Sequence, residues 1–251
     1  MTRDRVRTSD ARDAWKTILC WKVQAAITRR SPHFFLGSGT MTTTTTPKDV
    51  FLFVPNLIGY ARIIATIVSL NLVGSWWSLV VYLASFVLDL VDGWVARQLG
   101  QTSELGGLLD MLTDRCSTMG LLYVLGKLYD HQIFLALAVL DVASHWCQMY
   151  SSAGQHHKSA TNNQNRHFLV RWFYGYYWFF GYLCVGTELT YLFLYAWTLT
   201  ESEDELRGIL QIGLVVGIPA CIAKQCVNCM QLVSSLQVIA ARDAEQHNKT
   251  S

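Results

Sequence analysis

Apolar stretches of membrane-spanning length follow one another after residue 50, and they limit the fold more than any other feature of the sequence. Of the 251 residues, 51% are hydrophobic and only 15% are charged. A helix of about 20 apolar residues crosses the hydrocarbon core of a bilayer. The stretches lack the period-two alternation that is typical of membrane barrels. We therefore predict an all-α, polytopic membrane protein.

Six of these stretches are expected to be transmembrane helices. They cover residues 50–73, 76–99, 105–128, 132–151, 168–199 and 208–241. The sequence thus predicts a membrane domain over residues 50–241, a basic N-terminal extension over residues 1–49 and a polar tail over residues 242–251. The extension carries nine Lys and Arg residues, and we expect it to be poorly ordered. Met41 is an alternative start within it.

Lys and Arg residues gather on one side of the predicted helices. Arg97, Arg171 and Arg242 belong to loops or tails on the same side as the N-terminal extension, whereas residues 201–205 on the opposite side are acidic. Because cytosolic segments carry an excess of Lys and Arg, both termini are expected in the cytosol. A polar cavity at this end of the six helices would then face the cytosol.

Four aspartates within two neighbouring apolar stretches are the strongest indication of function. Asp89 and Asp92 lie near the end of the second stretch, and Asp110 and Asp114 lie near the start of the third. Their spacing places each pair on one stripe of a helix, and the short turn between the helices lets the stripes face each other. Carboxylates inside a membrane are costly unless a partner neutralises them.

Divalent cations are the partners that best suit this arrangement, because Mg²⁺ and Mn²⁺ prefer oxygen ligands. Two such ions polarise a phosphoryl group and stabilise its leaving oxygen. Gly93, Ala96 and Gly106 leave space for a ligand on the two stripes, and Arg97 offers a planar donor to phosphate. A proton relay or a cation pathway also uses intramembrane carboxylates and is the alternative interpretation.

The pattern D-x2-D-G-x2-A-R-x8-G-x3-D-x3-D is complete between residues 89 and 114. It resembles the signature of the CDP-alcohol phosphatidyltransferases. Within that family, residues 51–63, 109–119 and 140–146 are similar to eukaryotic phosphatidylinositol synthases. The resemblance extends over roughly residues 50–240 and does not include the N-terminal extension.

The resemblance implies a metal-dependent transfer of the phosphatidyl group from CDP-diacylglycerol to myo-inositol, with release of CMP. It implies that Asp89, Asp92, Asp110 and Asp114 bind two Mg²⁺ or Mn²⁺ ions and that Asp114 is also the general base. The implied partners are the two substrates, the lipid bilayer and a second copy of the chain in a homodimer, and no nucleic acid. The implied location is the endoplasmic reticulum membrane, with the active site facing the cytosol.

The resemblance also implies which residues hold the CDP-lipid. They are Gly93, Ala96, Arg97, Ser103 and Gly106. The sequence departs from the family where Tyr177 and Thr187 stand in place of a common Arg and Asn. Arg171 lies close enough in sequence to replace the missing guanidinium near the acceptor.

Several further polar residues are candidates for contacts with the acceptor or the headgroup. Asn56 and Arg62 are expected at the depth of the aspartates, where they face either the site or the headgroup interface. Asp141 and His145 lie one helical turn apart, so they form a polar contact inside the bundle, lining the acceptor cavity, or bind a metal. Arg115 follows Asp114 directly and is expected to point away from the aspartates and pair elsewhere.

Two other functions are compatible with parts of this pattern. A phosphatidylglycerophosphate or phosphatidylserine synthase would share the aspartates but not residues 109–119 and 140–146. A cation transporter would also use buried carboxylates, but it would more often show internal repeats or broken helices, and the sequence has neither.

Overall fold

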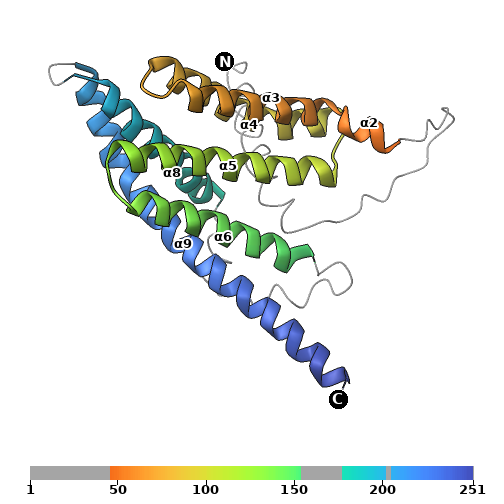
Figure 1. Ribbon diagram of the computed structural model, residues 1–251. Coiled ribbons are helices and arrows are strands. Elements are labelled where there is room, and N and C mark those ends of the chain that lie inside the picture. Colours follow the sequence, from red (N-terminus) through yellow and green to blue (C-terminus); the bar gives the residue numbers. More distant parts are fainter. Residues whose placement is uncertain (1–45, 154–176, 202–204, 251) are drawn as a thin grey trace, which may run out of the picture. The chain divides into compact units, whose positions relative to one another are not determined.

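The structure is a computed structural model that describes residues 46–153, 177–201 and 205–250. All regular secondary structure in these residues is helical (Figure 1). The helices are α2 (Pro47–Phe51), α3 (Val54–Asn71), α4 (Trp76–Gln98), α5 (Glu104–Leu128), α6 (Ile133–Ala153), α8 (Tyr177–Leu199) and α9 (Glu205–Thr250). Residues 1–45 of the predicted N-terminal extension lie outside the described residues, as do residues 168–176 of the fifth predicted stretch, whereas the last residues of the extension begin α2.

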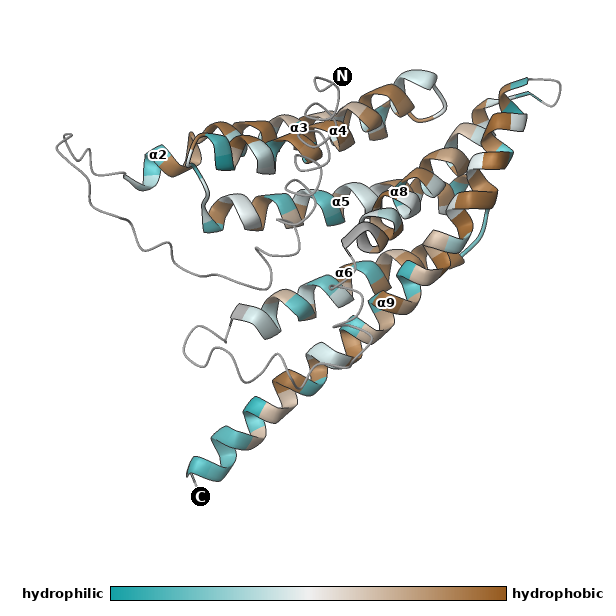
Figure 2. Cartoon of the chain, turned by 180° about the vertical axis from the view of Figure 1, so that it is seen from behind, coloured by the Kyte–Doolittle hydropathy of each residue, from teal (hydrophilic) through white to brown (hydrophobic). Residues whose placement is uncertain are grey.

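Three predicted stretches agree with α4, α5 and α6 to within two residues at each end. The first stretch differs, because the chain divides it into the short helix α2 and the longer helix α3. Pro55 is the second residue of α3, where its missing N–H is not needed for a helical hydrogen bond. The sixth stretch also differs, since α9 continues through the predicted polar tail to Thr250. Its last turns are hydrophilic (Figure 2).

Contacts within the chain define two compact units, each of which is described by itself. The first unit contains the chain up to Ser69 together with Val80–Asp114. In it, the Ser85 hydroxyl of α4 donates to the backbone carbonyl of Arg62 in α3 at 3.2 Å. A Cβ atom at Gly59 of α3 would lie 2.7 Å from Leu109 of α5, so the missing side chain lets these helices pack closely.

The second unit contains Leu70–Leu79 and the chain from Arg115 onward. Here α8 and α6 each pack along α9 (Figure 1). Leu183 of α8 and Ala220 and Val227 of α9 form a buried apolar cluster. The Tyr182 hydroxyl donates to the backbone carbonyl of Val216 at 2.9 Å, which adds a polar link between the same two helices.

Three of the described helices are long and apolar enough to cross a membrane. They span Trp76–Gln98, Ile133–Ser152 and Glu205–Lys249. Large apolar side chains on these helices are exposed, including Trp77 at 68% and Ile212 at 69%. Such exposure is unfavourable in water and is expected where a helix faces lipid. These helices support the prediction of an all-α membrane protein.

Candidate metal and phosphate site

One guanidinium group joins the four aspartates of the first unit into a single cluster. The Nη1 atom of Arg62 lies 2.7 Å from Asp92 Oδ2 and 3.0 Å from Asp110 Oδ1. Its Nη2 atom lies 2.6 Å from Asp89 Oδ1 and 2.6 Å from Asp114 Oδ1. We call these five residues the aspartate cluster. Of the two positions that the sequence allowed for Arg62, the structure therefore selects the one facing the aspartates.

Three helices and one turn position this cluster. Arg62 comes from α3, one aspartate pair from α4 and the other pair from α5. Gly100 adopts a φ of 63° in the turn between α4 and α5, a left-handed conformation that glycine tolerates without strain. Gln101 in the same turn accepts a hydrogen bond from the backbone N–H of Val54 at 2.9 Å. The turn thus reverses the chain and also supplies a hydrogen-bond acceptor to a free N–H group in the first turn of α3.

The aspartate cluster has the donor set and the spacing that a divalent ion needs. Asp89, Asp92 and Asp110 each offer a carboxylate oxygen, and these oxygens lie within 4.8 Å of one another. In the four ion pairs above, one guanidinium is shared by four carboxylates. Carboxylates gathered at one point favour the binding of cations. The residues present therefore fit a divalent metal.

A pocket lined largely by small side chains adjoins two of these aspartates. Its lining residues are Pro55, Asn56, Gly59, Asp92, Gly93, Ala96, Gln101, Thr102, Ser103, Gly106, Gly107, Leu109 and Asp110. Four of the five residues predicted to hold the CDP-lipid belong to this set. The fifth, Arg97, lies in the last turn of α4, is half-buried and is not among the described lining residues.

Local hydrogen bonds shape the wall of this pocket. The Ser103 hydroxyl accepts a hydrogen bond from the backbone N–H of Gly106 at 2.9 Å and so caps the start of α5. A Cβ atom at Gly106 would lie 2.8 Å from Asn56 Oδ1. Asn56 is buried and donates to the backbone carbonyl of Val50 at 2.6 Å. Its Oδ1 atom has no hydrogen-bond partner within the described chain, so it is available to a donor on a ligand.

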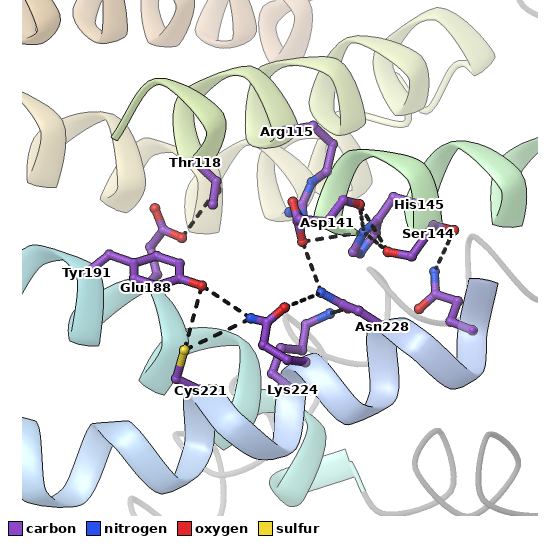
Figure 3. A network of polar contacts seen from close by, with 12 residues as sticks. Arg115, Thr118, Asp141, Ser144, His145, Glu188, Tyr191, Cys221, Lys224 and Asn228 are labelled. Carbon is purple, nitrogen blue, oxygen red and sulfur yellow. Dashed lines mark hydrogen bonds and ion pairs between the residues drawn. The ribbon is translucent and has the colours of Figure 1, made fainter. Parts of the chain in front are cut away.

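A second polar group lies inside the second unit (Figure 3). Arg115 Nη1 donates to both carboxylate oxygens of Asp141, at 2.8 and 2.6 Å. His145 Nδ1 lies 2.8 Å from the backbone carbonyl of Asp141. Asn228 Nδ2 donates to Asp141 at 3.4 Å and its Oδ1 accepts from Lys224 at 2.6 Å. We call these five residues, with the nearby pair of Thr118 and Glu188, the α6–α9 network.

The α6–α9 network decides between several interpretations that the sequence left open. Asp141 and His145 form the polar contact predicted inside the bundle, rather than part of a cluster of metal ligands among the described residues. Arg115 pairs away from the aspartate cluster, as predicted. The sequence analysis missed Lys224 and Asn228, although a lysine in an apolar stretch with an amide four residues later was a usable signal.

Two residues of the acceptor prediction, Arg171 and Thr187, have different outcomes, and Glu188 follows Thr187 in α8. Arg171 lies outside the described residues, as do the other residues of the range 154–176. Thr187 is buried in α8, and its hydroxyl has no hydrogen-bond partner within the described chain. Glu188 accepts a hydrogen bond from the Thr118 hydroxyl at 3.2 Å.

Comparisons with known proteins identify the family to which the chain is similar. A family model described as CDP-alcohol phosphatidyltransferase matches residues 52–202. The chain is 38% identical to the CDP-diacylglycerol–inositol 3-phosphatidyltransferase of Homo sapiens, over 80% of this chain and 98% of that protein. It is 35% identical to the corresponding Schizosaccharomyces pombe protein, over 79% of this chain and 93% of that one.

A plant protein gives a similar result. The chain is 35% identical to the probable CDP-diacylglycerol–inositol 3-phosphatidyltransferase 2 of Arabidopsis thaliana, over 80% of this chain and 95% of that protein. No solved structure matches the chain. The similarity to the plant, yeast and mammalian proteins therefore covers nearly their whole length.

Proposed function

The chain belongs to the CDP-alcohol phosphatidyltransferase family, and we propose that it transfers the phosphatidyl group of CDP-diacylglycerol to myo-inositol, giving phosphatidylinositol and CMP. The observation that carries this proposal is the identity of 35–38% with relatives that are named for this reaction and are covered almost end to end. A complete aspartate cluster beside a pocket of small residues supports it.

The aspartate cluster would hold the metal ions of the reaction. In our proposal, Asp89, Asp92, Asp110 and Asp114 bind two Mg²⁺ or Mn²⁺ ions. Bound there, the ions would supply charge neutralisation to the pyrophosphate and to the phosphate of the leaving CMP. The side chains of Asp89 and Asp92 are 8% and 10% exposed, so their charges are held largely away from water.

Asp114 is our candidate for the general base. Its side chain is 25% exposed, about three times as much as that of Asp89, so an incoming alcohol could reach it. Asp114 would accept the proton of one inositol hydroxyl while the hydroxyl oxygen forms a bond to the phosphorus that carries diacylglycerol. The bond from this phosphorus to the bridging oxygen breaks in line, and CMP leaves with that oxygen.

The small-residue pocket would receive the cytidine diphosphate part of the lipid. Gly93, Ala96, Ser103 and Gly106 line it without filling it, so a ligand backbone can approach the helices closely. Arg97 in the last turn of α4 would add a planar cationic donor to phosphate. The Oδ1 atom of Asn56, which has no hydrogen-bond partner among the described residues, would accept a hydrogen bond from the nucleotide or the acceptor.

The membrane arrangement is also part of the proposal. We infer six transmembrane helices, formed by α3, α4, α5, α6, α8 and α9, in the membrane domain 50–241. The excess of Lys and Arg on one side of these helices supports a site and termini facing the cytosol. A homodimer in the endoplasmic reticulum membrane would match the family. Because the donor is a lipid, a site at membrane depth lets the acyl chains stay in the bilayer.

Incorporation of labelled inositol by the purified full-length protein, given CDP-diacylglycerol and Mn²⁺, tests the function. We expect labelled phosphatidylinositol together with an equal amount of CMP. The variant Asp114→Asn removes the base and should lower turnover by roughly 10³-fold. Asp130→Asn is the matched control, because Asp130 is exposed in the turn after α5 and its φ of 47° suits asparagine equally well.

Competition among alcohols distinguishes inositol from other acceptors. We expect unlabelled serine and glycerol 3-phosphate to leave the incorporation of inositol unchanged. Product from either of these alcohols, with none from inositol, would instead identify a phosphatidylserine or phosphatidylglycerophosphate synthase. An Arg171→Gln variant with a raised KM for inositol alone would support the proposed replacement of the missing guanidinium.

A further inference from the structure

We infer that Arg62 is a resident counter-ion, which holds the aspartate cluster together before metal binds and gives up its ion pairs when metal binds. This inference rests on the metal site in the proposed function. It assigns to Arg62 a positioning role that opposes metal affinity while it preserves the shape of the site.

The arrangement of the four ion pairs supports this role. Nη1 of Arg62 bridges Asp92 of α4 and Asp110 of α5, and Nη2 bridges Asp89 of α4 and Asp114 of α5. Each terminal nitrogen therefore joins one aspartate from each helix. Without a cation at this position, the two aspartate pairs would repel each other across the gap between α4 and α5.

A backbone hydrogen bond fixes the position of Arg62 in α3, whereas carboxylates are the only groups that hold its guanidinium among the described residues. The backbone carbonyl of Arg62 accepts the hydroxyl of Ser85 in α4. The side chain is 3% exposed, and its Nε atom is buried without a hydrogen-bond partner within the described chain. If a cation took over these carboxylates, no other bond within the described part of the chain would keep the guanidinium in place.

Arg62 and a metal ion would use the same oxygens. The guanidinium lies 2.6–3.0 Å from one oxygen of each aspartate, and Asp89, Asp92 and Asp110 offer oxygens within 4.8 Å of one another. A Mg²⁺ ion bound to oxygens at about 2.1 Å would lie next to the guanidinium, and the two positive charges would repel. Metal binding should therefore weaken the ion pairs of Arg62.

Metal binding and melting of the full-length protein in detergent test this inference without reference to turnover. The variants are Arg62→Gln, which removes the charge, and Arg62→Lys, which keeps the charge but loses the planar fork. The control is Arg207→Gln, since Arg207 contacts Thr200 and the Trp197 ring, outside the aspartate cluster. Free Mn²⁺ is measured by electron paramagnetic resonance, and melting is followed with chelator and with increasing Mn²⁺.

We expect Arg62→Gln to melt at a lower temperature than the wild type in chelator and to reach the wild-type temperature at saturating Mn²⁺. The half-saturating Mn²⁺ concentration should fall about tenfold, because a competing positive charge is gone. For Arg62→Lys, the melting temperature in chelator and the half-saturating Mn²⁺ concentration should lie between those of the wild type and of Arg62→Gln. The control Arg207→Gln should bind Mn²⁺ as the wild type does. An Arg62→Gln protein that can be purified only with Mn²⁺ present would also support the inference.

A half-saturating concentration that is raised or unchanged in Arg62→Gln would overturn the inference, and so would an unchanged melting temperature in chelator. If the wild type makes phosphatidylinositol while Mn²⁺ neither binds nor raises the melting temperature, the counter-ion role fails and the function stands. If Mn²⁺ binds as expected but inositol is not a substrate, the function fails and the counter-ion role stands.

Discussion

The aspartate cluster and the α6–α9 network both gather charged side chains that are buried or half-buried, yet these charges are paired differently in the two groups. In the ion pairs of the aspartate cluster, one guanidinium faces four carboxylates. In the α6–α9 network, the cations are those of Arg115 and Lys224 (Figure 3). The anions are those of Asp141 and Glu188, so the formal charges cancel.

In our proposal, this difference separates a site that binds a ligand from a group of charges that supports the fold. Four carboxylates that share one guanidinium favour an external cation, which in our proposal is a divalent metal together with the phosphates that it would bind. Buried charges that compensate each other fix the positions of the helices that carry them. The same residue type, aspartate, can therefore have opposite roles in α4 and α6, and the isosteric change to asparagine tests each role.

The largest expected effect is on the turnover of Asp92→Asn. Asp92 both lines the small-residue pocket and contributes an oxygen to the group that could hold a metal. Loss of this ligand should lower inositol transfer by about 10³-fold. The melting temperature in chelator should change little, because three carboxylates still pair with Arg62 and one repulsive charge is gone. Unchanged turnover, or unfolding of the variant, would contradict the contrast between a ligand-binding aspartate cluster and a structural α6–α9 network.

The next effect is the loss of stability in Asp141→Asn. The change removes the carboxylate charge that pairs with the half-buried Arg115 and should lower the free energy of unfolding by about 3 kcal/mol. The half-saturating Mn²⁺ concentration should stay at the wild-type value. Melting and Mn²⁺ binding in detergent measure the two effects.

A double variant provides the control for this second prediction. Replacing both partners, as in Arg115→Met with Asp141→Leu, should restore much of the stability because no unpaired charge is left. A normal melting temperature in Asp141→Asn, or an altered Mn²⁺ response, would contradict the structural role of the α6–α9 network.

The smallest effect is expected for Thr118→Val. This variant loses the hydrogen bond of 3.2 Å to Glu188 and should lose about 1 kcal/mol of stability or less. Thr113→Val is the control, because the Thr113 hydroxyl bonds only to the carbonyl of Leu109 one turn earlier among the contacts described. Thermal melting compares the two variants. An effect on inositol KM without one on melting would show that Glu188 contacts the acceptor instead.

Local sequence information was enough for several helices and for the aspartates. Residues 76–99, 105–128 and 132–151 are continuous and apolar, so their length and hydropathy predict α4, α5 and α6 closely. Spacings of three and four residues put each aspartate pair on one helical stripe whatever the rest of the chain does. The break between α2 and α3 was missed because Pro55 is compatible with either one helix or two.

The partners of the buried charges could not be predicted from local sequence information. Arg62 and Asp114 are 52 residues apart, and Asp141 and Asn228 are 87 apart. Their contacts depend on how far one helix is rotated and shifted against another. That register is decided by close packing, such as that of Gly59 on Leu109, which hydropathy does not specify.

The sequence by itself determined the helical membrane character of the chain, the four aspartates and the family signature, because these depend on composition and short spacings. Only the tertiary structure decided that Arg62 lies among the aspartates and that Asp141 pairs with Arg115. The physical reason is that each buried charge takes the partner that helix packing brings within a few ångströms, wherever that partner lies in the chain.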